Sequence, residues 1–258
     1  KGLYGHPEID VERGIGFASG RLGHIWPFAN GIAMAHPHLS VVVLGSDGAQ
    51  MEGNDAEAAR LAVARKLNVK LLIDDNNVTI AGHPSEYLPG FSVEATLAGH
   101  GLAVNSGQAE EFRDLYARVQ NALIQPGPFG VVNRRVMATG VKGIEGETVG
   151  HDAIPVKHAR AYLLERGHEA AAEYLAGVEK LTNEVVYRRS STDVGSNRKK
   201  FGEVVSDIID QLPEAERAKR VMVIDSDLAG STGLSTIAAR HPEVFVYGGV
   251  MERGNFSA

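Results

Sequence analysis

The stretch Leu39–Thr79, LSVVVLGSDGAQMEGNDAEAARLAVARKLNVKLLIDDNNVT, decides the fold of this chain. It opens with a valine-rich apolar run over Leu39–Gly45, and a second apolar run covers Val69–Ile73. The alanine-rich segment between them predicts a helix capped by Asn54 or Asp55. Strand, helix and strand within about 35 residues predict a βαβ unit with parallel strands and a right-handed crossover.

Polar residues follow both predicted strands. Asp47 comes directly after the first, and Asn76 follows the second. The carboxyl ends of parallel strands form the edge at which α/β sheets bind their ligands, and oxygen ligands of this kind suit Mg²⁺ or Ca²⁺. Gly48 can offer its N–H to a phosphate near a helix N-terminus. The residues therefore favour a metal–diphosphate site, and the alternative is a capped turn with an Asx turn.

Composition describes an ordinary globular protein. The chain has 258 residues, 43% hydrophobic and 22% charged, which allows one large or two smaller domains. Its net charge of −6 argues against a general nucleic-acid role. The absence of cysteine excludes disulfides, thiol nucleophiles and cysteine-bound zinc, and is compatible with a cytoplasmic protein. No apolar run reaches the ~20 residues of a membrane span. Because the chain starts at Lys1 and stops at Ala258, we expect a piece of a longer protein or of a split system.

The rest of the pattern also alternates helix and strand, so we expect an α/β fold with a parallel sheet flanked by helices. Helices are expected over residues 25–35, 109–124, 157–181, 198–212 and 234–240, and strands over 102–104, 129–132, 135–137, 221–224 and 244–247. The composition of Tyr187–Asn197 is that of a linker. We therefore place a first domain at 1–184, a linker at 185–197 and the beginning of a second α/β domain at 198–258.

These motifs together carry a resemblance to a known family. The run Ser46-Asp-Gly, followed about thirty residues later by Asn76-Asn-Val-Thr, resembles the thiamine-diphosphate signature of transketolases. Further segments resemble transketolase motifs in the same order along the chain: Gly5–Glu8 (GHPE), Gly20–Gly23, Gly150–Pro155, Arg198–Gly202, Asp225–Ser231 and Val250–Gly254. The resemblance covers nearly the whole chain.

The resemblance implies a thiamine-diphosphate-binding fold, with a diphosphate-binding domain at 1–184 and the N-terminal part of a pyrimidine-binding domain at 198–258. It implies a cytoplasmic transketolase of carbohydrate metabolism that moves a two-carbon ketol unit between sugar phosphates. The implied cofactors are thiamine diphosphate and Mg²⁺ or Ca²⁺. The implied assembly is a homodimer with active sites between subunits, and neither nucleic acid nor a membrane is expected as a partner.

The resemblance also assigns roles to individual residues. Asp47, Asn76 and the backbone carbonyl of Val78 would bind the metal. Glu252 would hydrogen-bond the cofactor pyrimidine and promote its activation, and His151 would act as a general acid and base. The remaining implied contacts are Gly20, Arg21, Leu22, Gly48, Glu52, Asn76, His151, Asp227 and Glu252 with the cofactor, and Arg198, Ser231 and His151 with the substrate.

Several alternatives stay open. Ser46 replaces the first glycine of the usual Gly-Asp-Gly, so the turn must accommodate a side chain. Taken singly, Glu252 suits a helix start, His151 a polar loop and Arg198 a solvated face. Other thiamine-diphosphate enzymes also fit: a deoxyxylulose-phosphate synthase, a dihydroxyacetone synthase or a 2-oxo acid dehydrogenase component. A non-catalytic or split subunit is the alternative from another class. Four histidines lie near one another in sequence: His6, His24, His36 and His38. Their spacing does not fit a metal-binding HExxH motif, so we expect them to be structural or to neighbour the cofactor pocket.

Overall fold

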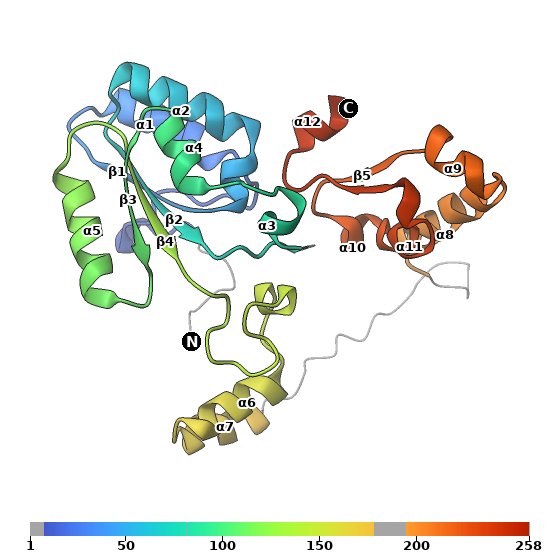
Figure 1. Ribbon diagram of the computed structural model, residues 1–258. Coiled ribbons are helices and arrows are strands. Elements are labelled where there is room, and N and C mark those ends of the chain that lie inside the picture. The colour runs from blue at the N-terminus through green and yellow to red at the C-terminus, as the bar shows by residue number, and fades with distance from the viewer. Residues whose placement is uncertain (1–7, 81, 178–194, 258) are drawn as a thin grey trace, which may run out of the picture. The chain divides into compact units, whose positions relative to one another are not determined.

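The computed structural model describes residues 8–80, 82–177 and 195–257 (Figure 1). The chain divides into two compact units. The first comprises Lys1–Asn77, Leu88–Arg135 and Val250–Ala258, and the second comprises Val78–Tyr87 and Val136–Gly249.

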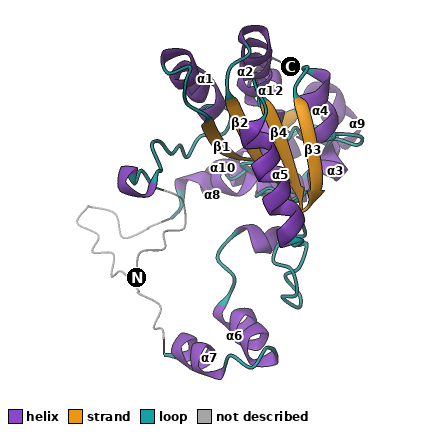
Figure 2. Ribbon diagram, turned by 90° about the vertical axis from the view of Figure 1, so that its left-hand side faces the viewer, coloured by secondary structure: helices purple, strands orange, loops and turns teal. Residues whose placement is uncertain are grey.

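A four-stranded parallel sheet forms the centre of the first unit (Figure 2). Its strands are β1 (Val41–Ser46), β2 (Val69–Asp75), β3 (Ala103–Gln108) and β4 (Phe129–Arg134), arranged in the order β1-β2-β4-β3. All three pairings are parallel. The predicted α/β class with a parallel sheet flanked by helices is thus confirmed, as are the two parallel strands of the βαβ unit.

Helices cover both faces of this sheet. On one face, α1 (Ile25–Ala35), α2 (Gly53–Arg65) and α4 (Val93–Gly99) pack over the main apolar core. On the other, α5 (Phe112–Ile124) packs against β3 and β4. The alanines of α2 keep that helix close to the strands, because their side chains add little bulk between backbone and sheet.

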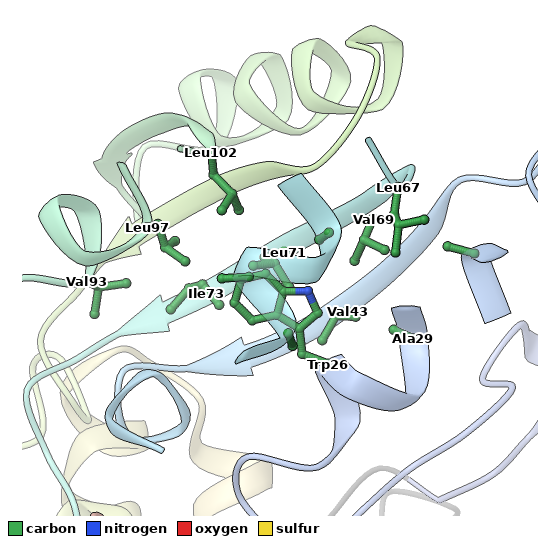
Figure 3. Packing of buried hydrophobic residues seen from close by; sticks show 14 of the residues in the cluster. Trp26, Ala29, Val43, Leu67, Val69, Leu71, Ile73, Val93, Leu97 and Leu102 are labelled. Carbon is green, nitrogen blue, oxygen red and sulfur yellow. The ribbon is translucent and has the colours of Figure 1, made fainter. Parts of the chain in front are cut away.

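The main core is built around Trp26, which is 1% exposed (Figure 3). Its ring lies over the side chains of β1 and β2 that point to this face, Val43, Leu71 and Ile73. Parallel sheets bury both faces, and accordingly the first five residues of β2, Val69–Ile73, are apolar apart from Lys70.

Lys70 is the one polar residue in the apolar part of β2, residues 69–73. Its side chain is fully buried, and its ammonium donates to the backbone carbonyls of Gln125 and Gly127, each at 2.6 Å. Both carbonyls belong to the residues that directly follow α5. Burial lowers the pKa of Lys70, and the two carbonyls provide the hydrogen bonds that a buried ammonium requires.

The second unit contains a two-stranded parallel sheet, β5 (Val223–Asp225) with β6 (Phe245–Tyr247). Ile209, Ile237 and Val244 form its core. Its other elements are α3 (Pro84–Tyr87), η3 (Thr148–His151), α6 (Val156–Glu165), α7 (Glu169–Ala176), α8 (Asn197–Asp210), α9 (Glu214–Arg220), α10 (Ala229–Thr232), α11 (Ser235–Arg240) and η4 (Pro242–Val244).

The short elements η1 (Val11–Arg13), η2 (Gly48–Met51) and α12 (Glu252–Ser257) complete the first unit. None of the helices in the described part of the chain has the length and apolar character needed to cross a membrane.

Most of the predicted helices and strands agree with the structure, but one strand, one helix and one helix cap do not. Residues 135–137 are not a strand, because β4 ends at Arg134, where the chain leaves the sheet. The helix expected over 157–181 is, up to residue 177, two helices, α6 and α7, separated at Gly167, whose φ is 73°; residues 178–181 lie outside the described residues. The cap of α2 is Glu52 rather than Asn54 or Asp55. The predicted boundary at 185–197 falls largely within residues 178–194, outside the described residues, and stays a prediction.

Candidate functional site

The carboxylate of Asp47 joins the ends of β1 and β2. In the parallel register Ser46 pairs with Asp74, and the N–H of Asp47 donates to the carbonyl of Asp74 at 3.0 Å. Oδ1 of Asp47 accepts from the N–H of Gly48, and Oδ2 accepts from the N–H of Asn77, both at 2.8 Å. The predicted residues at the two strand ends are thus brought together, with Asp47 bonded directly to the backbone beside Asn76.

Burial dominates the electrostatics of this carboxylate. Asp47 is 2% exposed, and desolvation raises its pKa to about 6. The N–H groups of Asn77 and Gly48 lower the pKa, while the charges of Asp75 and Asp74 raise it. Burial also raises the pKa of Asp75. Negative charge is therefore concentrated where α/β sheets bind ligands, and a cation would stabilise it.

Asp74 and Arg135 orient Asn76. Nε and a terminal nitrogen of Arg135 bind the two carboxylate oxygens of Asp74, each at 2.7 Å, in a forked ion pair. The same carboxylate accepts from Nδ2 of Asn76 at 3.1 Å. The amide nitrogen of Asn76 is therefore directed to Asp74, and its oxygen lies on the opposite side of the amide group.

The predicted metal ligands contain only one carboxylate. Among residues 8–80, 82–177 and 195–257, no three His, Cys, Asp or Glu side chains come together as a metal-binding group. The predicted set does not need such a group, since it combines Asp47 with the amide oxygen of Asn76 and the carbonyl of Val78. Oxygen donors with a single carboxylate fit Mg²⁺, which fills its shell with water and phosphate oxygens. Asn77 adopts φ 58° between the last two of these residues, and Val78 is 3% exposed.

The turn after β1 differs from the expectation in one respect. The predicted phosphate donor, the N–H of Gly48, donates to Asp47 within the chain. The unusual Ser46 has a structural role, because its hydroxyl accepts from the N–H of Ala49 at 3.3 Å. The side chain at this position therefore fits the turn and helps to cap η2.

The glycine loop predicted to contact the cofactor packs on Glu52. Gly23 has φ 70°, and a Cβ there would lie 2.6 Å from Cβ of Glu52, so only glycine fits. Glu52 is 8% exposed, whereas Gly20, Arg21 and Leu22 are exposed. The loop thus presents its first three residues to solvent and packs its last against the residue that caps α2.

In the second unit, Asp227 follows β5 with φ 65° and is 7% exposed. Its Oδ1 accepts from the hydroxyl of Thr79 at 2.7 Å. The backbone of Arg198 at the start of α8 lies against Gly233, where a Cβ would meet the Arg198 carbonyl oxygen at 1.9 Å. The segments that contain the predicted substrate residues Arg198 and Ser231 are therefore neighbours, and both residues are exposed.

The two predicted catalytic residues are both exposed: His151 ends η3, and Glu252 begins α12. His151 belongs to the second unit and Glu252 to the first. The sequence-based predictions did not include Asp74, Arg135 and Thr79. Asp74 lies in the last two residues of β2 and Arg135 directly follows the neighbouring strand β4, so the strand-end argument used for Asp47 could have found them.

Comparison with known proteins points to one family, although no family model matches the chain. The chain is 29% identical over 188 residues to one subunit of an apulose-4-phosphate transketolase from Phocaeicola vulgatus, covering 70% of this chain and 64% of that protein. It is 29% identical over 160 residues to the protein of the same name from Actinobacillus succinogenes, covering 59% and 57%. A transketolase of Aquifex aeolicus is 41% identical over 93 residues, which cover 30% of this chain and 14% of that one.

A solved structure supports the same fold. The transketolase of Campylobacter jejuni aligns with 93% of this chain and 45% of its own length, with a TM-score of 0.53 and 18% identity. The chain therefore spans less than two thirds of each of these relatives.

Proposed function

The chain is related to the transketolases, and from this relationship we propose that it is a thiamine-diphosphate enzyme of the transketolase type, moving a two-carbon ketol unit from a ketose phosphate to an aldose. The observation that supports this function best is the carboxylate of Asp47. It is buried at the sheet edge and hydrogen-bonded to the backbone after both strands. Burial and the neighbouring acids raise its pKa.

The proposed metal is Mg²⁺, with Ca²⁺ as the second choice. Asp47, Asn76 and the carbonyl of Val78 would hold it, and the cation would offset the negative charge concentrated at this edge. Asp74 and Arg135 would act indirectly, because their ion pair orients the amide of Asn76.

The proposed cofactor contacts involve several segments. Gly48 would bind the diphosphate through its N–H, which a ligand would share with Asp47. Gly20, Arg21 and Leu22 would line the pyrimidine, with Glu52 supporting their loop through Gly23. When bound, the cofactor supplies an electron sink for cleavage of a carbon–carbon bond. Glu252 would hold a proton at a pyrimidine nitrogen.

Substrate contacts are proposed for the exposed polar residues of the second unit. Arg198 and Ser231 would bind a sugar phosphate, for which the guanidinium is suited by its forked geometry. His151 would transfer protons at substrate oxygens. Asp227 would lie on the thiazolium side of the cofactor.

A homodimer is the proposed assembly, with the cofactor bound between its two chains. The second candidate is a two-chain enzyme, because two relatives are named as single subunits of a transketolase and the chain spans only part of each. Turnover of xylulose 5-phosphate by this chain alone would favour the homodimer, and turnover only with a complementary chain would favour the split enzyme. Another thiamine-diphosphate reaction remains the alternative if the cofactor binds and this ketose is inert in both assays.

Calorimetry with thiamine diphosphate and Mg²⁺ tests the cofactor site. Asp47→Ala should abolish Mg²⁺-dependent binding. Asp55→Asn is the matched control, since Asp55 is also buried with a raised pKa and has no proposed ligand role. Equal affinity of wild type and Asp47→Ala would disprove the proposed site.

A further inference from the structure

A hydroxyl–carboxylate contact joins two distant segments of the second unit. The hydroxyl of Thr79 lies 2.7 Å from Oδ1 of Asp227, 148 positions away along the chain. Thr79 is 5% exposed and Asp227 is 7% exposed. Since a hydrogen bond to a charged group strengthens when water is excluded, this contact is stronger than an exposed bond of the same type.

The Thr79 hydroxyl donates its hydrogen to the Asp227 carboxylate. The Thr79 hydroxyl also lies 3.1 Å from the carbonyl oxygen of Gly82 and 3.3 Å from the hydroxyl of Tyr87. A threonine has one hydrogen to donate, and the carboxylate is both the nearest and the strongest of these acceptors. Tyr87 can donate to the threonine oxygen in return, so both hydroxyl groups take part in one network.

A second contact holds the same segment. Gly249, just after β6, has φ 64°, and a Cβ there would lie 2.5 Å from the ring of Tyr87. The segment Val78–Tyr87 is thus fixed near its start by Thr79 and at its end by Tyr87. Both contacts are made with residues that follow β5 or β6.

Asp227 requires such support. Its φ of 65° is in the left-handed region, which Asp adopts more readily than most residues but still at a cost. Asp225 supports the turn by accepting from the N–H of Leu228 at 3.1 Å. The Asp227 carboxylate itself is directed by Thr79.

We propose that Thr79 is a positioning residue: its hydroxyl orients the Asp227 carboxylate and so raises the affinity of the protein for thiamine diphosphate without contacting the cofactor. The inference rests on the proposed function, in which Asp227 lies beside the thiazolium. Thr79 directly follows Val78, a proposed metal ligand, so within the second unit the segment that carries this ligand also holds the Asp227 carboxylate.

Calorimetry with thiamine diphosphate and Mg²⁺ tests this role. Thr79→Val, which keeps the shape and removes the hydroxyl, should weaken binding about tenfold. Thr79→Ser, which keeps the hydroxyl, should stay within about threefold of the wild type. Thr232→Val is the control, because that hydroxyl donates to the Leu228 carbonyl at 2.9 Å within its own helix. Wild-type affinity in Thr79→Val, or equal losses in the serine and valine variants, would overturn the inference.

A double-mutant cycle without cofactor separates this inference from the proposed function. Urea unfolding of Thr79→Val, Asp227→Ala and the double variant should show coupling, because the second substitution costs less once the first has removed the contact. The backbone cost of alanine at Asp227 cancels in the cycle. Coupling near zero overturns the inference even if the wild type binds the cofactor. If the cycle shows coupling but the wild type binds no cofactor, the proposed function is overturned, and with it the role of Thr79 in cofactor affinity.

Discussion

Asp55 should make the first unit less stable as pH rises. Its carboxylate is 3% exposed in the first turn of α2, where Oδ2 accepts from Nε2 of Gln50 at 3.1 Å. Oδ1 is buried without a hydrogen-bond partner among the described residues. Burial raises the pKa of Asp55 from 3.8 to about 7, against the opposing effect of the Gln50 bond. The folded protein therefore binds the proton more tightly than the unfolded chain does.

The sign and size of the effect follow from this difference in pKa. Below pH 3.8 the carboxyl is neutral in both states, and the free energy of unfolding is unaffected. Between 3.8 and about 7 the unfolded state loses its proton first, so stability falls as pH rises. Above this range the full cost applies, about 4 kcal/mol at 1.36 kcal/mol per pKa unit.

Asp55→Asn removes that ionisation. We expect the variant to be about 2 to 4 kcal/mol more stable than the wild type at pH 8, with the gain disappearing towards pH 4. Urea unfolding followed by the fluorescence of Trp26, the only tryptophan, reports on this unit.

The matched control is Asp114→Asn. Asp114 also lies in the first turn of a helix, α5, but is exposed. Its loss should cost less than about 1 kcal/mol at pH 8, because a carboxylate there only stabilises the helix dipole. A pH-independent difference between Asp55→Asn and the wild type, or a variant less stable at pH 8, would refute the reasoning.

Three further substitutions test other contacts of the first unit. Lys70→Met should cost about 3 kcal/mol in urea unfolding, since two partly buried backbone carbonyls lose the buried ammonium that donates to them. Arg135→Lys should weaken Mg²⁺-dependent cofactor binding about tenfold and cost about 1 kcal/mol of stability. Lysine cannot form the forked ion pair with Asp74 that orients the amide of Asn76. Unchanged affinity in calorimetry would contradict this. Ser46→Gly should lower the free energy of unfolding by about 1 kcal/mol through loss of the bond from Ala49, with cofactor affinity unchanged.

The fold was predictable where local pattern and tertiary structure agree. The apolar runs that became β1 and β2, and the alanines between them, determine both local conformation and burial. Lys70 did not disturb this prediction, because one polar residue in an apolar run leaves the pattern intact. The strand predicted at 135–137 is wrong, because where β4 ends depends on the partner strand β2, whose last residue pairs with Arg134.

The candidate site was predictable to the same extent. Strand-end logic places Asp47 and Asn76 at one edge, and the structure ties Asp47 to the backbone next to Asn76. The partnership of Thr79 and Asp227 was not predictable, since no local rule relates residues 148 positions apart. Only packing of the segment Val78–Tyr87 within the second unit brings them together.

The hydrogen bonds of Asp47 show why a sheet edge of this kind favours a cation. Both oxygens already accept a backbone N–H, which is the arrangement that normally lowers the pKa of a carboxylate. The pKa is nevertheless raised to about 6, so two good donors do not offset burial and the nearby charges of Asp75 and Asp74. At neutral pH the folded chain therefore holds this carboxylate ionised at a cost of about 3 kcal/mol. A ligand that binds the ionised form recovers that free energy, and a divalent cation does so while it also screens the two neighbouring acids. Burial of Asp47 thus creates a cost that a divalent cation bound at the proposed site would remove.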